Sequence, residues 1–334
     1  MKELFAKMFI NLQLFAEMNT NVTRDSGLSV EMKTFYDMTL IDEASPNLVH
    51  DQFGQKRPIP ANGGKKIEFR KFASLPKALS PLTEGVTPDG KKLTVTAIEA
   101  EVSQYGDYIV QSDVLELTTI DNTIVEATKI LGRQAGLTLD TITRNILHSA
   151  TNQWICPKAD GTAVTNLADF SQLDPTCVLT VDVIKQVVAD LKANNAPKIN
   201  GDYVAIIHPY VAYDLMSDPE WIEAHKYAKP DNLYEGEIGK VAGVRFVETS
   251  EAKVYEGGVF GTLILGDGAY GVTEITGGGL QTIVKQKGSA GTADPLDQRS
   301  SVGWKAMKTA EILVQPYMAL IYSKSKLSAK ASEN

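Results

Sequence analysis

Two runs of alternating apolar and polar residues, separated by a long polar segment, constrain the fold most strongly. Residues 66–72 (KIEFRKF) place Ile67 and Phe69 between charged side chains, as in a strand with one solvated face. Residues 93–102 (LTVTAIEAEV) alternate in part, and the segment 80–92 between the runs is rich in Pro, Gly and charge. The pattern predicts an extended two-stranded arm, with a hairpin inside a compact sheet as the alternative. An isolated ribbon is only marginally stable in water, so such an arm needs a surface to lie on.

After this segment the pattern becomes helical. Ser112 or Asp113 can cap a short helix, and a longer run continues to about Ser149. The apolar stripe along the longer run consists of Ile124, Leu131, Ile142 and Ile146. At 1.5 Å per residue this helix would be about 40 Å long, which suits a spine better than an element of a packed bundle. Gly132 and Gly136 allow a neighbouring segment to approach it closely.

The remaining chain mixes helices and short strands. A helix is predicted through 183–191, and another begins at Pro209. Strands are predicted at 203–207, 244–248, 259–265, 270–275, 280–285, 312–314 and 317–322. An arm, a long helix and then mixed elements indicate an α+β fold.

Composition excludes several classes of protein. The chain has 334 residues, 43% apolar and 22% charged, with a net charge of −8, which is an ordinary globular mixture. The acidic balance argues against a dedicated nucleic-acid binder. Cys156 and Cys177 provide neither a disulfide framework nor a cysteine-based zinc site, and a reducing cytoplasm is a simpler interpretation than a bond between them. No apolar run approaches the roughly 18 residues that cross a membrane.

The N-terminus carries an apolar stripe at helical spacing. Its members are Leu4, Phe5, Met8, Phe9, Leu12 and Phe15. A secretory signal would need an unbroken apolar centre and a small-residue cleavage site, which are not present. The spacing predicts an amphipathic helix that docks on a partner surface. Adsorption to a membrane is the weaker alternative, because the polar face is not notably basic.

No arrangement of residues points strongly to catalysis. The four histidines lack metal-ligand spacing, and only His208 has acidic residues close behind it in the sequence, namely Asp214, Asp218 and Glu220. A structural histidine at a strand end is the favoured interpretation of His208. The glycine clusters lack the Lys-Ser/Thr of a phosphate loop. We therefore predict that the chain is not an enzyme and has no catalytic residue, metal or cofactor.

Residues that could contact another subunit are more informative than the candidate catalytic residues. Glu84, Asp89, Lys91 and Lys92 lie at the predicted tip of the arm and are predicted to contact a neighbouring subunit. Such charges add little binding energy individually, but they fix the position of one subunit relative to the next. A solvated loop is the alternative.

Several segments, in this order, resemble the major capsid proteins of tailed bacteriophages, especially the podovirus-type branch. They are FGQKRPIPANGGKKIEFRKF from Phe53, LPKALSPLTEGVTPDGKKL, SQYGDYI, HPYVAYDLMSDPEWIEA from His208, GKVAGVRFVETSEA from Gly239 and DPLDQRSSVGWKAM from Asp294. The resemblance covers about residues 28–324. In addition, NLQLFA from Asn11 resembles the start of many structural proteins from phages of low-GC Gram-positive bacteria.

The resemblance implies a four-part fold. The expected parts are an N-terminal arm (1–50), an extended two-stranded loop (51–110), a peripheral domain with a long spine helix (111–180 plus 315–334) and an axial domain with a mixed sheet (181–314). The long, charged N-terminal extension that some relatives use as a built-in scaffold is lacking here. Scaffolding is therefore expected from a separate protein or from the N-terminal stripe.

The resemblance also implies a function. A major capsid protein self-assembles into hexamers and pentamers of an icosahedral shell around the double-stranded DNA of the phage, without sequence-specific DNA binding and without a membrane. A scaffolding protein and a portal are the expected partners, and the expected location is the virion capsid, assembled in the host cytoplasm. The alternatives are an encapsulin-like nanocompartment shell and, in another class, a cytoplasmic enzyme of unknown reaction.

Overall fold

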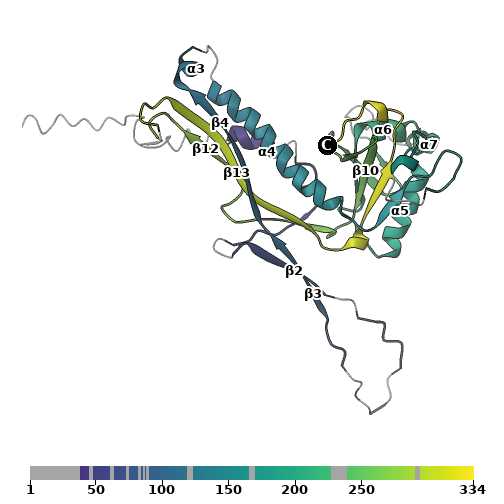
Figure 1. Cartoon of the computed structure of the whole chain (residues 1–334). Helices are drawn as coiled ribbons and strands as arrows, with labels where there is room; N and C mark the ends of the chain where they lie inside the picture. The colour runs from purple at the N-terminus through teal and green to yellow at the C-terminus, as the bar shows by residue number, and fades with distance from the viewer. Residues whose placement is uncertain are drawn as a thin grey trace, which may run out of the picture.

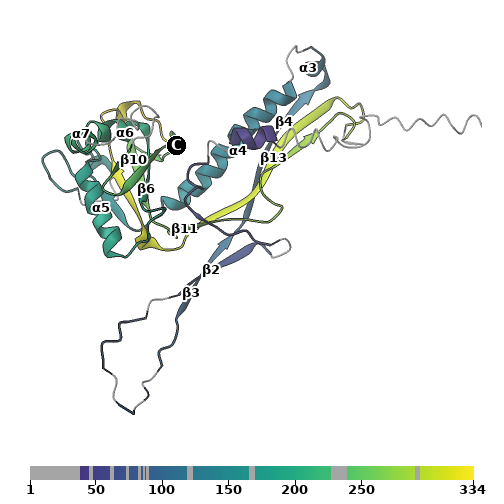
Figure 2. The same ribbon diagram turned by 180° about the vertical axis from the view of Figure 1, so that it is seen from behind.

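The computed structural model consists of two packed units and a projecting arm (Figures 1 and 2). It describes residues 38–44, 48–60, 64–72, 75–81, 84–85, 87, 90–118, 123–164, 170–226, 239–289 and 294–334. Each unit is built on one sheet, and the arm extends away from both.

The first unit is a long helix on a five-stranded sheet. Helix α4 (Thr123–Leu147) lies along β13 (Arg299–Ile312). β13 pairs with β4 (Ser103–Ser112) on one side and with β11 (Tyr270–Glu274) and β12 (Gln281–Lys285) on the other. The short β1 (Gln55–Lys56) extends the sheet beside β11, and α3 (Asp113–Thr118) follows β4.

Periodicity explains how this unit packs. Leu131, Ala135 and Leu139 recur every four residues, so they form one stripe of α4. Val302, Trp304 and Ala306 alternate along β13, so they share one face of the sheet and pack against that stripe. The long helix is confirmed, with its end two residues before the predicted one.

The short helix at residues 38–44 crosses α4 where a glycine makes room for it. A β-carbon at Gly132 would lie 2.8 Å from the carbonyl oxygen of Leu40. The close approach predicted for Gly132 is therefore confirmed. Leu40 is fully buried in the core between the two helices and the sheet.

The second unit is a seven-stranded mixed sheet with helices packed on it. Its strands are ordered β5 (Gln153–Ile155), β14 (Met318–Ser323), β10 (Val259–Leu265), β6 (Tyr203–Ile207), β8 (Val244–Glu248) and β7 (Lys240–Val241), with β9 (Val254–Tyr255) beside β10. The helices are α5 (Val181–Ala193), α6 (Pro209–Met216) and α7 (Pro219–Lys226). Single 3₁₀ turns occur at Phe170–Gln172, Gln315–Tyr317 and Ser328–Lys330. β6 is apolar throughout, and β10 and β14 are apolar except for Thr262 and Ser323. All three strands are buried along their whole length, as central strands covered on both faces.

The arm is formed by β2 (Lys66–Phe72) and β3 (Val95–Glu101), antiparallel in register from Lys66 opposite Glu101 to Phe72 opposite Val95. The two strands have no other partner among the described strands, and the arm points away from both units (Figure 1). The alternative of a hairpin inside a compact sheet is therefore wrong.

The sheets divide the chain differently from the predicted domain ranges. Residues 315–334 were expected beside the spine helix, but β14 lies within the seven-stranded sheet between β5 and β10. Conversely, residues 270–312 were expected in the axial domain, but β11, β12 and β13 form the sheet under α4. The physical reason is long-range pairing: β13 and β14 are consecutive in sequence, yet each is completed by strands distant in the chain.

Candidate assembly surfaces

The arm buries almost none of its own apolar surface. Among the arm side chains that the structure describes, only Phe69 and Ala100, at its base, are buried. Towards the tip, four large apolar side chains are exposed: Leu75, Leu79, Leu93 and Val95, with Leu79 at 83%. Fully burying one such side chain contributes about 1.5–3 kcal/mol. The arm therefore offers binding energy that the isolated subunit does not use.

Three of the four charged residues predicted at the arm tip are described by the structure. Glu84, Lys91 and Lys92 are exposed, and Asp89 lies outside the described residues. Lys91 reaches back across the arm, where its Nζ donates to the carbonyl oxygen of Pro76 at 3.4 Å. Their contact with a neighbouring subunit remains a prediction.

The N-terminal stripe from Leu4 to Phe15 lies outside the described residues, and its docking role also remains a prediction.

A second exposed apolar surface lies at the end of the first unit, on β4 and α3. It consists of Tyr108 and Val110 on β4 with Val114 and Leu117 on α3, and Leu117 is 81% exposed. Sequence reasoning missed this surface because β4 itself was not predicted. The short apolar run Tyr108, Ile109 and Val110 was the available signal, and Gly106 and the flanking polar residues weakened it.

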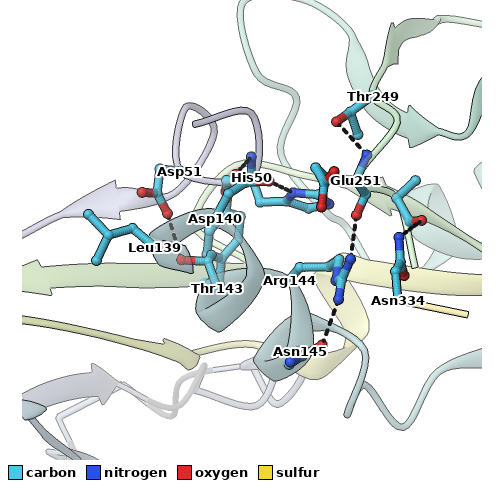
Figure 3. Close-up of polar contacts among 12 residues, drawn as sticks. His50, Asp51, Leu139, Asp140, Thr143, Arg144, Asn145, Thr249, Glu251 and Asn334 are labelled. Atoms are coloured by element: carbon cyan, nitrogen blue, oxygen red, sulfur yellow. Dashed lines mark hydrogen bonds and ion pairs between the residues drawn. The ribbon is translucent and has the colours of Figure 1, made fainter. Parts of the chain in front are cut away.

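A buried polar network lies where α4, the segment 48–53 and β13 meet (Figure 3). Asp140 on α4 is fully buried and accepts two hydrogen bonds from His50, one from the backbone N–H and one at Nδ1, both 2.7 Å long. Asp51 accepts a hydrogen bond from Thr143 at 2.6 Å and pairs with Lys308 of β13. Lys308 also donates to the carbonyl oxygen of Leu139.

Burial dominates the electrostatics of this network. Desolvation lowers the pKa of Lys308, and the neighbouring Asp51 carboxylate opposes that shift. Removing one member of such a pair leaves the other charge buried and unpaired, so the network holds its three segments together strongly.

The same helix end joins the two units. Arg144 donates to the carbonyl oxygen of Glu251 at 2.7 Å, and His148 Nδ1 lies 2.9 Å from the hydroxyl of Tyr255 on β9 (Figure 3 shows the Arg144 contact). Burial lowers the pKa of His148 well below its ordinary value, and the nearby His50, Arg144 and Lys253 act in the same direction. His148 is therefore neutral in the folded subunit at pH 7.

His208 has the structural role predicted for it. It caps α6, where its Nδ1 accepts a hydrogen bond from the backbone N–H of Tyr210 at 3.1 Å. Burial lowers its pKa.

The acidic residues that follow His208 have other partners. Asp214 accepts from the backbone N–H of Lys326, Asp218 accepts from the backbone N–H of Val181, and Glu220 pairs with Lys185. Their roles are thus capping and surface pairing.

The described residues contain no group of three His, Cys, Asp or Glu side chains placed to hold a metal ion. Cys156 and Cys177 are free, buried thiols. Among the helices that the structure describes, none is both long and apolar enough to span a bilayer.

Comparison with known proteins gives a family and a fold. The model of a family described as phage capsid protein matches residues 125–266, from the start of α4 to the end of β10. A capsid structure of the cyanophage P-SCSP1u superposes with a TM-score of 0.65 at 14% identity, covering 84% of this chain and 89% of that one. The cyanophage Pam1 capsid asymmetric unit gives 0.64 at 13% identity, covering 93% and 98%. The search of curated protein sequences found no match.

Residues 125–266 thus match the phage capsid family, and the chain as a whole has the fold of phage capsid proteins. The α+β fold predicted from the sequence and the resemblance to tailed-phage major capsid proteins are both confirmed. The family match and the shared fold favour a structural, shell-forming protein over a cytoplasmic enzyme. An encapsulin-like shell is the weaker interpretation, because the matching family is described as phage capsid protein. A virus-like particle from Pyrococcus furiosus shares the fold at a TM-score of 0.50 and 12% identity.

Proposed function

We propose that this capsid protein assembles into hexamers and pentamers of a closed icosahedral shell that encloses the double-stranded DNA genome of a tailed phage. The single observation that carries the proposal is the arm, which is long, projects from the subunit and exposes four large apolar side chains. A ribbon of this kind is marginally stable alone and becomes stable when a neighbouring subunit covers it. A closed assembly gives every arm an equivalent neighbour.

Each part of the molecule has a proposed place in the shell. The unit built on the seven-stranded sheet is the axial domain, and the unit of α4 and β13 is the peripheral domain. The arm lies over a neighbouring subunit, where Glu84, Asp89, Lys91 and Lys92 register it. The stripe from Leu4 to Phe15 docks on a partner surface during assembly.

The proposed partners follow from the same function. A scaffolding protein guides assembly in the host cytoplasm, and a portal occupies one vertex. The net charge of −8 suits a shell that contains DNA. An acidic protein repels the phosphate backbone, so it does not bind host nucleic acid during assembly. The podovirus-type branch also remains a prediction.

Deleting residues 79–92 tests the role of the arm. We expect the variant to keep the circular dichroism spectrum and melting temperature of the wild type, because every described residue in this segment is exposed. We expect it to form no shells in electron micrographs after co-expression with the neighbouring phage genes. Normal shells from this variant would contradict the proposal.

Charge reversal tests the registering residues. The Lys91→Glu/Lys92→Glu variant is compared with Lys192→Glu, which changes an exposed lysine on α5, outside the arm. We expect fewer or malformed shells from the first variant and wild-type shells from the second. Equal behaviour of the two variants would show that the arm charges have no registering role.

A further inference from the structure

An aromatic side chain is buried at the base of the arm. Phe69 on β2 is 4% exposed, whereas its neighbours Glu68 and Arg70 on the strand are solvated. Its strand partner Ile98 is half-buried, and Ala100 further down β3 is buried. Beyond Phe69, every described side chain of the arm up to residue 93 is exposed. The described side chains that pack against the rest of the chain therefore lie at the base of the arm.

Phe69 is seated against a glycine. A β-carbon at Gly271 on β11 would lie 2.8 Å from two atoms of the Phe69 ring and 3.4 Å from a methyl group of Leu313. Contacts of 2.8 Å between carbon atoms are shorter than van der Waals contact. The ring therefore occupies the space that any larger residue at position 271 would need.

The contact between Phe69 and Gly271 lies where the chain crosses between the two units. Two residues before Gly271, the carbonyl oxygen of Ala269 accepts hydrogen bonds from the backbone N–H groups of both Leu313 and Val314. These residues lie on the connections from β10 to β11 and from β13 to β14, which join one sheet to the other. Phe69 also shares a small surface pocket with Leu313 and Val314.

The arm has a second link to the first unit. Only Val102 separates β3 from β4, and the backbone N–H of Val102 donates to the carbonyl oxygen of Lys65 at 2.9 Å. This link is a continuous strand, which can bend or twist at one residue. A side chain packed on β11 at a second point restricts that bending.

We infer that Phe69, seated against Gly271, is the positioning residue that sets the direction of the arm relative to the two units. The inference rests on the proposed function of the arm, and it assigns the control of arm direction to a single contact. Because the seat lies at the crossing between the sheets, a change in the angle between the units moves the arm with it.

Substitution of both partners tests the contact in the full-length chain. Gly271→Ala introduces a methyl group that pushes the Phe69 ring outward, and Phe69→Leu removes the ring atoms that this methyl group meets. The matched control is Gly54→Ala. It crowds the side chains of Tyr270, at 2.5 Å, and Val272, at 2.8 Å, on either side of Gly271 in β11, but it does not touch the arm.

Arm direction is measured as a distance between spin labels at Ser80→Cys on the arm and Glu256→Cys on the second unit, in labelled chains diluted with unlabelled ones. Both positions are exposed, and the two native cysteines are buried and stay unlabelled. We expect a shifted distance in Gly271→Ala, a broadened distribution in Phe69→Leu, and a return towards the wild-type distribution in the double variant. We expect no shift in Gly54→Ala.

Shell formation is the second readout. The yield of regular shells should fall in Gly271→Ala and recover in the double variant. A wild-type distance distribution in both single variants, or equal shifts in Gly271→Ala and the double variant, would overturn the inference. If deleting residues 79–92 abolishes shells while the Phe69 variants assemble normally, only this inference fails. If the deletion variant assembles normally, the proposed function of the arm fails first.

Discussion

The seven-stranded sheet and the arm use the same kind of apolar residue in opposite ways. All seven residues of β10 are buried, whereas β3 buries only Ala100 of its seven. The sheet is thus stabilised by contacts within one chain, whereas the arm leaves its apolar side chains exposed. Under the proposed function, the sheet belongs to the part that folds by itself and the arm to the part that assembly completes.

The junction between these regions should be the most sensitive to substitution. Lys308→Ala leaves the largely buried Asp51, 14% exposed, without its charged partner, which we expect to lower the free energy of unfolding by about 3 kcal/mol. Urea denaturation of the subunit measures the loss. Lys305→Ala, three residues earlier on β13 and more exposed, is the control. A loss below about 1 kcal/mol would mean that the buried pair does not hold the segment 48–53.

A pair of leucines compares the two regions directly. Leu263→Ala in β10 should lower the free energy of unfolding of the subunit by about 3 kcal/mol, because it leaves a cavity in a closed core. Leu79→Ala on the arm should leave that free energy unchanged, because the side chain is 83% exposed. It should instead lower the melting temperature of assembled shells. An equal loss of subunit stability in both variants would break the distinction.

Acidification should weaken the contact between the units through His148. Its pKa is lowered in the folded subunit, so the unfolded chain binds a proton that the folded chain does not. The stability that neutral His148 contributes is therefore fully present above pH 6.5, its ordinary pKa, and is lost as the pH falls towards the lowered pKa. Over that range the free energy of unfolding falls by at most about 1.4 kcal/mol per pH unit. Denaturation between pH 7 and 5 should show a steeper dependence in the wild type than in His148→Gln. Parallel curves would contradict the assignment.

Exposed ion pairs on the arm should contribute least to the free energy of unfolding of the subunit. Lys66 and Glu99 are 3.6 Å apart across the arm, and both side chains are well exposed. Lys66→Ala should change the free energy of unfolding by about 0.5 kcal/mol or less, measured by the same denaturation. A larger change would indicate that the ribbon contributes to subunit stability before assembly.

Local patterns predicted the elements whose faces differ in polarity. The alternation in residues 66–72 predicted β2 with the observed bounds, and the stripe through Leu131 predicted α4. β4 and most of β13 were missed, because Gly106, Gly303 and several Ser and Lys residues interrupt their alternation. These strands form because each supplies the partner of the other over ten residue pairs.

The candidate assembly residues were predictable only in part. The charged tip and the exposed arm followed from composition and spacing, and Leu79 lies in the segment that the pattern assigned to the arm. Neither the His50–Asp140 contact nor the seat of Phe69 on Gly271 has a local signal. Each joins residues that are far apart in the chain, 90 positions in the first case.

The sequence by itself determined that this chain has a two-stranded arm, a spine helix and mixed α and β elements, because periodicity and turn residues act over a few neighbouring positions. The tertiary structure decided which sheet each C-terminal strand completes and where the arm is anchored. It also decided which charges are buried together. Those features depend on pairing and packing between distant segments, and burial of a polar group is stable only where the fold supplies its partner.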